Sequence, residues 1–199
     1  MSIFNADIVE VIKIIGYLGI FSIVFAESGV FFGFFLPGGS MLFTAGLLAS
    51  QGLFNIYWLT LGVALAAVLG DNLGFWFGAK VGHKIFSKED SLFFNRKHLI
   101  RTKEFYEKYG AITVIIGRFV PIVRTFAPIL AGVGEMNYKK FLTYNIIGAM
   151  LWAVGLSLLG FFLGSVVSGI EKYIMPIIIL IVFLSILPII FNLKFKKAK

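Results

Sequence analysis

Residues 117–128 read GRFVPIVRTFAP and place two arginines and two prolines inside an apolar stretch that covers residues 111–133. Proline removes a backbone hydrogen bond and breaks or kinks a helix. One crossing of the hydrocarbon core takes about 20 helical residues, so this stretch cannot cross twice, but two half-helices joined by a turn can enter and return. We therefore predict a re-entrant hairpin with Pro121 and Pro128 at its tip, around Arg124.

A second apolar stretch, residues 29–50, is interrupted in the same way by Pro37, Gly38 and Gly39. It predicts a second re-entrant hairpin. Irregular backbone at membrane depth is tolerated only where protein or a water-filled cavity covers it, so both tips are expected in the interior of the fold.

Three further apolar stretches predict transmembrane helices: residues 8–26, 57–79 and 141–190, the last divided near Glu171 into two helices. Basic residues gather between Lys80 and Lys108 and again from Lys194 to Lys199, and such clusters belong on the cytoplasmic side. Residues 92 and 195 are then cytoplasmic and residues 52 and 171 external. The two hairpins enter from opposite sides.

A weak internal repeat supports this topology. With an offset of 86 residues, Gly46 matches Gly132 and Gly62 matches Gly148, and GFWFG from Gly74 matches GFFLG from Gly160. Inverted repeats with broken helices are a transporter architecture. The predicted fold is an all-α integral membrane protein with two opposed re-entrant hairpins plus transmembrane helices, in one domain over residues 1–199. Its halves are residues 27–82 and 111–168, followed by a C-terminal span over residues 173–193.

The composition of the chain agrees with a membrane protein. Of the 199 residues, 59% are hydrophobic and 14% charged, with a net charge of +8 and a mean hydropathy of +0.94. We assign the basic charge to membrane orientation rather than to nucleic-acid binding. There is no cysteine and there are two histidines, which excludes disulfides and cysteine-ligated or multi-histidine metal sites. We expect no cofactor, no metal and no cleaved signal peptide.

Among the ionisable residues within or beside the apolar stretches and away from the basic loops, we single out Glu27, Asp71, Arg118 and Arg124. Each costs about 3 kcal/mol near the bilayer centre, so they are expected to face one another or a wet cavity. The arginine fork suits bidentate binding of phosphate or carboxylate. Three structural alternatives stay open: Glu27 caps a helix, Arg118 snorkels to the headgroups, or Asp71 is only a partner of an arginine.

Glycines and tryptophans have simpler interpretations. Gly70, Gly74, Gly78 and Gly82 form a ladder on one helix face, which close helix packing explains. Trp58, Trp76 and Trp152 are expected at the membrane interface or in packing. Residues 86–109 are either an amphipathic helix on the membrane surface or a solvated loop.

Seven short motifs carry a resemblance to the DedA family of membrane proteins, also called the VTT or SNARE-associated domain group. They are ESG at Glu27, FLPGGS from Phe35, AGLLAS from Ala45, GDNLGFWFG from Gly70, GRFVPIVRTFAP from Gly117, AGVGEM from Ala131 and NIIGAMLW from Asn145. The chain resembles this family over nearly its whole length. The arginine motif is the most specific of the seven.

The resemblance implies two opposed re-entrant hairpins and translocation of lipid carriers such as undecaprenyl phosphate, or of phospholipids such as phosphatidylethanolamine. It implies that Glu27, Arg118 and Arg124 are the functional acid and arginine pair. Members of the family often have a second acid after Pro-Gly, where this chain has Gly39. This departure makes Glu27 the one hairpin carboxylate available for proton coupling.

The expected function is therefore a flippase for a phosphate-containing lipid, coupled to protons, in the bacterial inner membrane, with a homo-oligomer left open. A proton-coupled antiporter of small ions or drugs would use the same charges. We do not expect an enzyme, because no histidine or cysteine lies in an apolar stretch to act with a nucleophile or metal. A purely structural scaffold predicts that neutralising Arg124 has no effect on cells.

Overall fold

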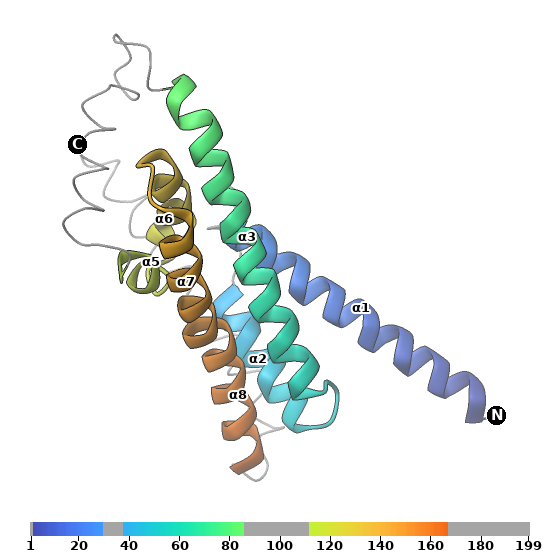
Figure 1. Ribbon diagram of the computed structural model, residues 1–199. Helices are drawn as coiled ribbons and strands as arrows, with labels where there is room; N and C mark the ends of the chain where they lie inside the picture. Colours follow the sequence, from blue (N-terminus) through green and yellow to red (C-terminus); the bar gives the residue numbers. More distant parts are fainter. Residues whose placement is uncertain (1, 30–37, 86–111, 167–199) are drawn as a thin grey trace, which may run out of the picture.

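The computed structural model describes residues 2–29, 38–85 and 112–166 (Figure 1). Several of the sequence predictions lie outside these ranges: those for Pro37, for the segment 86–109, for positions 92, 171 and 195, and for the C-terminal span 173–193. The described residues contain helices and no strand. The helices are α1 (Ser2–Gly29), α2 (Gly38–Ser50), α3 (Ile56–Ile85), α5 (Ile112–Gly117), α6 (Pro121–Val133), α7 (Tyr138–Ala149) and α8 (Gly155–Val166), with a π-helical turn η2 (Met150–Val154) between the last two.

Two helical segments are long and apolar enough to cross a membrane. They are residues 56–80 of α3, with 25 residues, and residues 138–166 of the continuous α7–η2–α8 helix, with 29. At 1.5 Å per residue they measure about 38 and 44 Å, more than the ~30 Å of the hydrocarbon core. The apolar parts of α1, α2 and α6 are shorter.

The stretch of residues 111–133 is broken directly before Pro121, at one edge of the tip that the sequence predicted. Three consecutive turns end α5, with the N–H groups of Arg118, Phe119 and Val120 bonded three residues back. Pro121 then begins α6, a position where its missing N–H costs nothing. Pro128 lies inside α6, so the expectation that it and Arg124 lie at the hairpin tip is wrong. A proline within a helix is tolerated here because packing against α3 holds the helix in place.

The short helices pack against the long ones in a reciprocal way. In Figure 1, α2 lies beside α8 near one end of the molecule, and α6 lies beside α3 toward the other. Glycine makes both contacts possible: a Cβ on Gly46 would overlap the backbone of α8, and a Cβ on Gly132 would overlap that of α3. The long helices contribute glycines to the same contacts: a Cβ on Gly78 of α3 would overlap the backbone of α6, and a Cβ on Gly160 of α8 would overlap that of α2.

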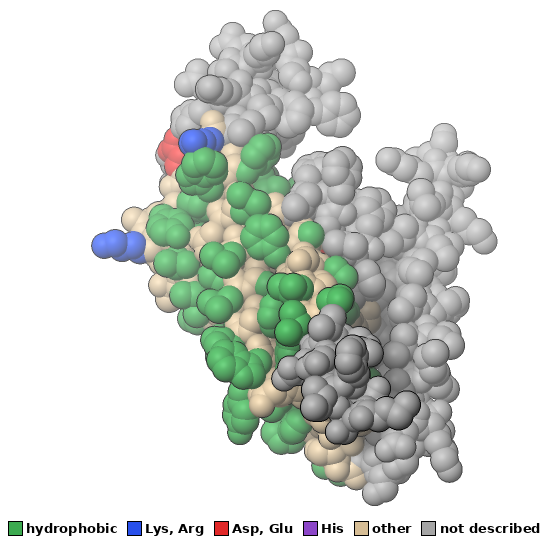
Figure 2. Space-filling model, turned by 90° about the vertical axis from the view of Figure 1, so that its right-hand side faces the viewer, with side chains coloured by type: hydrophobic (Ala, Val, Ile, Leu, Met, Phe, Trp, Pro, Cys, Tyr) green, Lys and Arg blue, Asp and Glu red, His purple; other side chains and the backbone are tan. Residues whose placement is uncertain are grey.

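Apolar side chains lie both in the core and on the outer surface. One buried cluster joins α1, α2, α3 and η2 around Leu42, Val63 and Ala153, and a smaller one joins α3, α5, α6 and α7 around Phe75 and Phe141. The outer faces of the long helices remain apolar, as at Leu61, Leu65, Leu151, Leu159 and Phe162. Figure 2 shows hydrophobic side chains spread over one such face, with the few visible charged side chains near its upper left. An apolar exterior of this kind suits contact with lipid.

Candidate functional site

The four ionisable residues singled out in the sequence are all buried. Their exposed fractions are 6% for Glu27, 1% for Asp71, 2% for Arg118 and 3% for Arg124. They come from the last turn of α1, the middle of α3, the break after α5, and α6. Arg118 therefore does not snorkel toward headgroups. Charges removed from water to this degree require partners, and the structure joins them into two ion pairs.

The first pair joins Glu27 and Arg124. Nη1 of Arg124 donates to Oε1 of Glu27 at 2.7 Å, and Nη2 donates to Oγ of Ser28 at 3.1 Å. The Thr125 hydroxyl donates to the carbonyl of Glu27 at 3.4 Å. The Glu27 carboxylate lies against the first residue of α2, since a Cβ on Gly38 would overlap it. Glycine at this position allows α1, α2 and α6 to meet at one carboxylate.

The second pair joins Arg118 and Asp71. Nη2 of Arg118 donates to Oδ2 of Asp71 and to Oδ1 of Asn145. Asn145 in turn donates to the backbone carbonyl of Val68 at 3.2 Å. Space for the arginine comes from Gly148 of α7, where a Cβ would lie 2.9 Å from Cδ and 3.0 Å from Nε of Arg118. The pair thus connects the break after α5 to both long helices.

An aromatic ring completes the environment of Arg124. Its Cζ atom lies 3.5 Å from the centre of the Trp152 ring, a cation–π distance. Trp152 is buried and belongs to η2, where the π-helical turn interrupts the long helix. Such turns are often found at functional sites. A Cβ on Gly39 would make ordinary contact with Trp152 and Leu156, so a side chain there would fit.

Several polar atoms of this cluster have no hydrogen-bond partner among the described residues. They are Oε2 of Glu27, Oδ1 of Asp71, Nε and Nη1 of Arg118, and Nε of Arg124. Buried polar atoms of this kind are rare and require an explanation. Each arginine thus has at least one N–H donor without an acceptor in the part of the chain that the structure describes.

Two members of the cluster were not predicted from the sequence, whereas Trp152 packs in the core, as one of its two expected roles. Asn145 and Ser28 lie within the motifs NIIGAMLW and ESG, and their polar side chains in apolar segments were the available signal. Trp152 was assigned to packing or the interface. The described residues contain no group of three or more histidine, cysteine, aspartate or glutamate side chains arranged to hold a metal ion.

Comparison with known proteins agrees with a membrane protein. Residues 21–162 match the model of the VTT domain. Protein DedA of Escherichia coli is 42% identical over 174 residues, which cover 86% of this chain and 79% of DedA. The chain belongs to the DedA family of membrane proteins.

Two further relatives are named as membrane proteins. An uncharacterized membrane protein of Mycobacterium tuberculosis is 46% identical over 172 residues, covering 85% of this chain and 75% of that protein. The inner membrane protein YqjA of Escherichia coli is 30% identical over 148 residues, covering 74% and 67%. No solved structure matches the chain.

Proposed function

We propose that this protein is a transporter that moves a phosphate-containing lipid, such as undecaprenyl phosphate, across the bacterial inner membrane. The observation that carries the proposal is the pair of buried arginines, each held by a single carboxylate and each with N–H donors that have no partner among the described residues. A guanidinium binds phosphate through parallel N–H bonds, so Arg124 and Arg118 are the proposed phosphate ligands.

The mechanism follows from the cost of separating a buried ion pair. Removing one partner of such a pair costs about 3–5 kcal/mol because the other charge is left uncompensated. A substrate phosphate that accepts from Arg124 compensates the guanidinium while Glu27 is released. The released carboxylate then lies in an apolar surrounding without its counter-charge and takes up a proton. Lipid and proton would cross together, which is the proposed coupling.

The proposed topology has two opposed re-entrant hairpins and several membrane crossings. The reciprocal contacts support it, because the offset of 86 residues that relates Gly46 to Gly132 and Gly74 to Gly160 also relates α2 to α6 and α3 to α8. The contact of α2 with α8 therefore corresponds to the contact of α6 with α3. Two interlocked halves of this kind are how inverted-repeat transporters surround a central site.

The decisive experiment replaces Arg124 by lysine and measures movement of a labelled phosphate lipid in liposomes. Arg124→Lys keeps the charge but not the fork, so we expect at least a tenfold loss of transport. Lys140→Arg, at an exposed position, is the matched control and is expected to transport like wild type. Near-normal transport by Arg124→Lys would show that positive potential alone suffices.

The competing function is a proton-coupled antiporter of small ions or drugs, which would use the same charges. It is separated by the substrate in the same liposomes. If lipid does not move while an added ion or drug dissipates the pH gradient, the antiporter is correct. Catalysis is not part of the proposal, since the sequence places no histidine or cysteine in an apolar stretch.

A further inference from the structure

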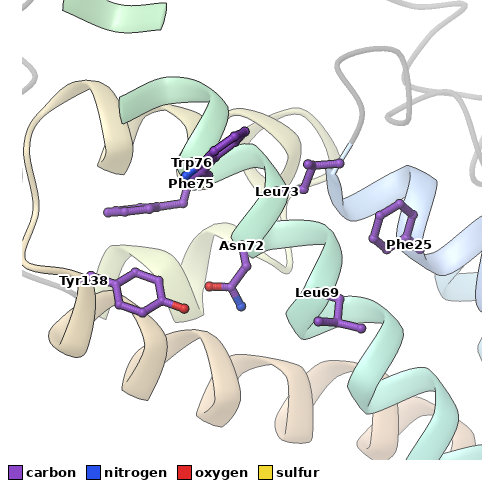
Figure 3. A pocket seen from close by; sticks show the side chains of 7 residues that line it. All are labelled: Phe25, Leu69, Asn72, Leu73, Phe75, Trp76 and Tyr138. Carbon is purple, nitrogen blue, oxygen red and sulfur yellow. The ribbon is translucent and has the colours of Figure 1, made fainter. Parts of the chain in front are cut away.

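An apolar groove lies on the outer side of α3. It has a volume of about 640 Å³ and is lined from α3 by Leu69, Asn72, Leu73, Phe75 and Trp76. Phe25 of α1 and Tyr138 at the start of α7 complete it. Figure 3 shows Phe25 at one end, Tyr138 at the other, and Asn72 between them. The volume is within the ~300–1,000 Å³ of ligand pockets in proteins.

We propose that this groove holds a hydrocarbon chain of an anionic phospholipid, with the headgroup at the rim formed by Trp76, Lys80 and Tyr138. The proposal rests on the function proposed above, in which such a lipid is the substrate. It assigns the place where that lipid is held before its phosphate reaches the buried arginines.

The rim of the groove combines a positive charge with aromatic side chains. The Nζ atom of Lys80 lies 3.7 Å from the centre of the Trp76 ring, and Trp76 lines the groove. The rings of Tyr138 and Phe75 lie 5.6 Å apart, which brings the start of α7 beside this part of α3. Tryptophan, tyrosine and lysine together mark the interface at which anionic headgroups lie. The body of the groove is apolar, so the two ends of a phospholipid each find a matching environment.

Asn72 places a polar side chain in the wall of the groove. Nδ2 of Asn72 donates to the carbonyl of Val68 at 2.8 Å, and the same carbonyl accepts from Asn145, the partner of Arg118. Oδ1 of Asn72 is buried without a hydrogen-bond partner among the described residues. In Figure 3 the hydroxyl of Tyr138 points toward this amide. Asn72 at the groove and Asn145 beside Arg118 are therefore bonded to the same backbone carbonyl.

A photoreactive lipid tests the groove without relying on transport. The full chain is reconstituted in liposomes of phosphatidylcholine and phosphatidylglycerol, where the phosphatidylglycerol carries a diazirine in its acyl chain, and cross-linked peptides are mapped by mass spectrometry. We expect adducts concentrated on residues 69–76 and 138. Leu73→Trp fills the groove and should lower them at least fivefold, whereas Leu65→Trp, exposed on α3 outside the groove, should not.

The headgroup is tested with a charge variant. Lys80→Gln should reduce labelling by diazirine-bearing phosphatidylglycerol and leave labelling by diazirine-bearing phosphatidylcholine unchanged. Adducts spread evenly along the exposed face of α3, and insensitive to Leu73→Trp, would mean that bulk lipid alone covers the groove and would overturn the proposal. If wild type is labelled as expected but moves no lipid, the proposed function fails and the groove remains a lipid site.

Discussion

The guanidinium of Arg124 is held between a carboxylate and an indole: Glu27 accepts from it at 2.7 Å, and Trp152 lies 3.5 Å from its Cζ atom. The contact with Trp152 has a property that the ion pair lacks. The indole ring uses none of the five N–H donors of Arg124, because it contacts the face of the guanidinium rather than its edge. In the proposed mechanism, Arg124 exchanges the carboxylate for a phosphate while the indole keeps the side chain in position.

This arrangement predicts that Trp152→Leu lowers lipid transport by roughly 5- to 30-fold, since a desolvated cation–π contact contributes about 1–2 kcal/mol. Trp152→Phe retains an aromatic face and should recover most of the rate. Trp58→Leu, at an exposed tryptophan of α3, is the control and should change transport little. The measurement is the initial rate of lipid movement in liposomes at matched protein content. Equal losses for Trp152→Phe and Trp152→Leu would indicate a packing role only.

The Arg118–Asp71 pair predicts a non-additive effect on stability. Asp71→Asn leaves a buried guanidinium without its counter-charge and should lower the free energy of unfolding by about 3–5 kcal/mol. Adding Arg118→Gln removes the uncompensated charge and should restore part of that loss. Thermal unfolding of the purified protein in detergent gives the four melting temperatures of the cycle. A double variant less stable than Asp71→Asn by the full cost of Arg118→Gln alone would contradict the pairing.

Proton coupling is predicted to depend on Glu27. Glu27→Gln is a near-isosteric mimic of the protonated carboxyl, so its lipid transport should no longer respond to an imposed pH gradient, whereas the wild-type rate should. The measurement compares both proteins in liposomes with and without an acidic exterior. A variant that keeps the wild-type response to the gradient would leave Glu27 as a structural partner of Arg124.

The opposed hairpins are tested by labelling single cysteines, which can be placed freely because the chain has none. Residue 52 is a poor position, since Gly52 has a φ of 80° that other residues rarely adopt. Leu53→Cys in the same turn should react with an impermeant maleimide added from outside. Lys140→Cys should react only from the cytoplasmic side. Labelling of Leu53→Cys from the cytoplasmic side alone would reverse the proposed topology.

The amino-acid sequence by itself was enough to predict an all-helical membrane protein and to find the four charges of the site. Long apolar runs and lysine clusters are local features, and a charge within an apolar run is costly wherever the fold places it. Pro121 likewise marked the break in the stretch of residues 111–133, because proline suits the first turn of a helix. Pro128 misled the prediction, since contact with α3 stabilises a helix that proline alone would end.

Only the tertiary structure decided which charges pair. Glu27 and Arg124 are 97 residues apart, and Asp71 and Arg118 are 47 apart, so neither pairing follows from local spacing. The same holds for the contact of Trp152 with Arg124, where the π-helical turn meets α6, and for the groove at Asn72, where α1, α3 and α7 meet. The physical reason is that the chemistry of a charged or aromatic side chain is a property of the residue itself. Which residue becomes its partner depends on how distant helices approach one another, here at Gly38, Gly132 and Gly148.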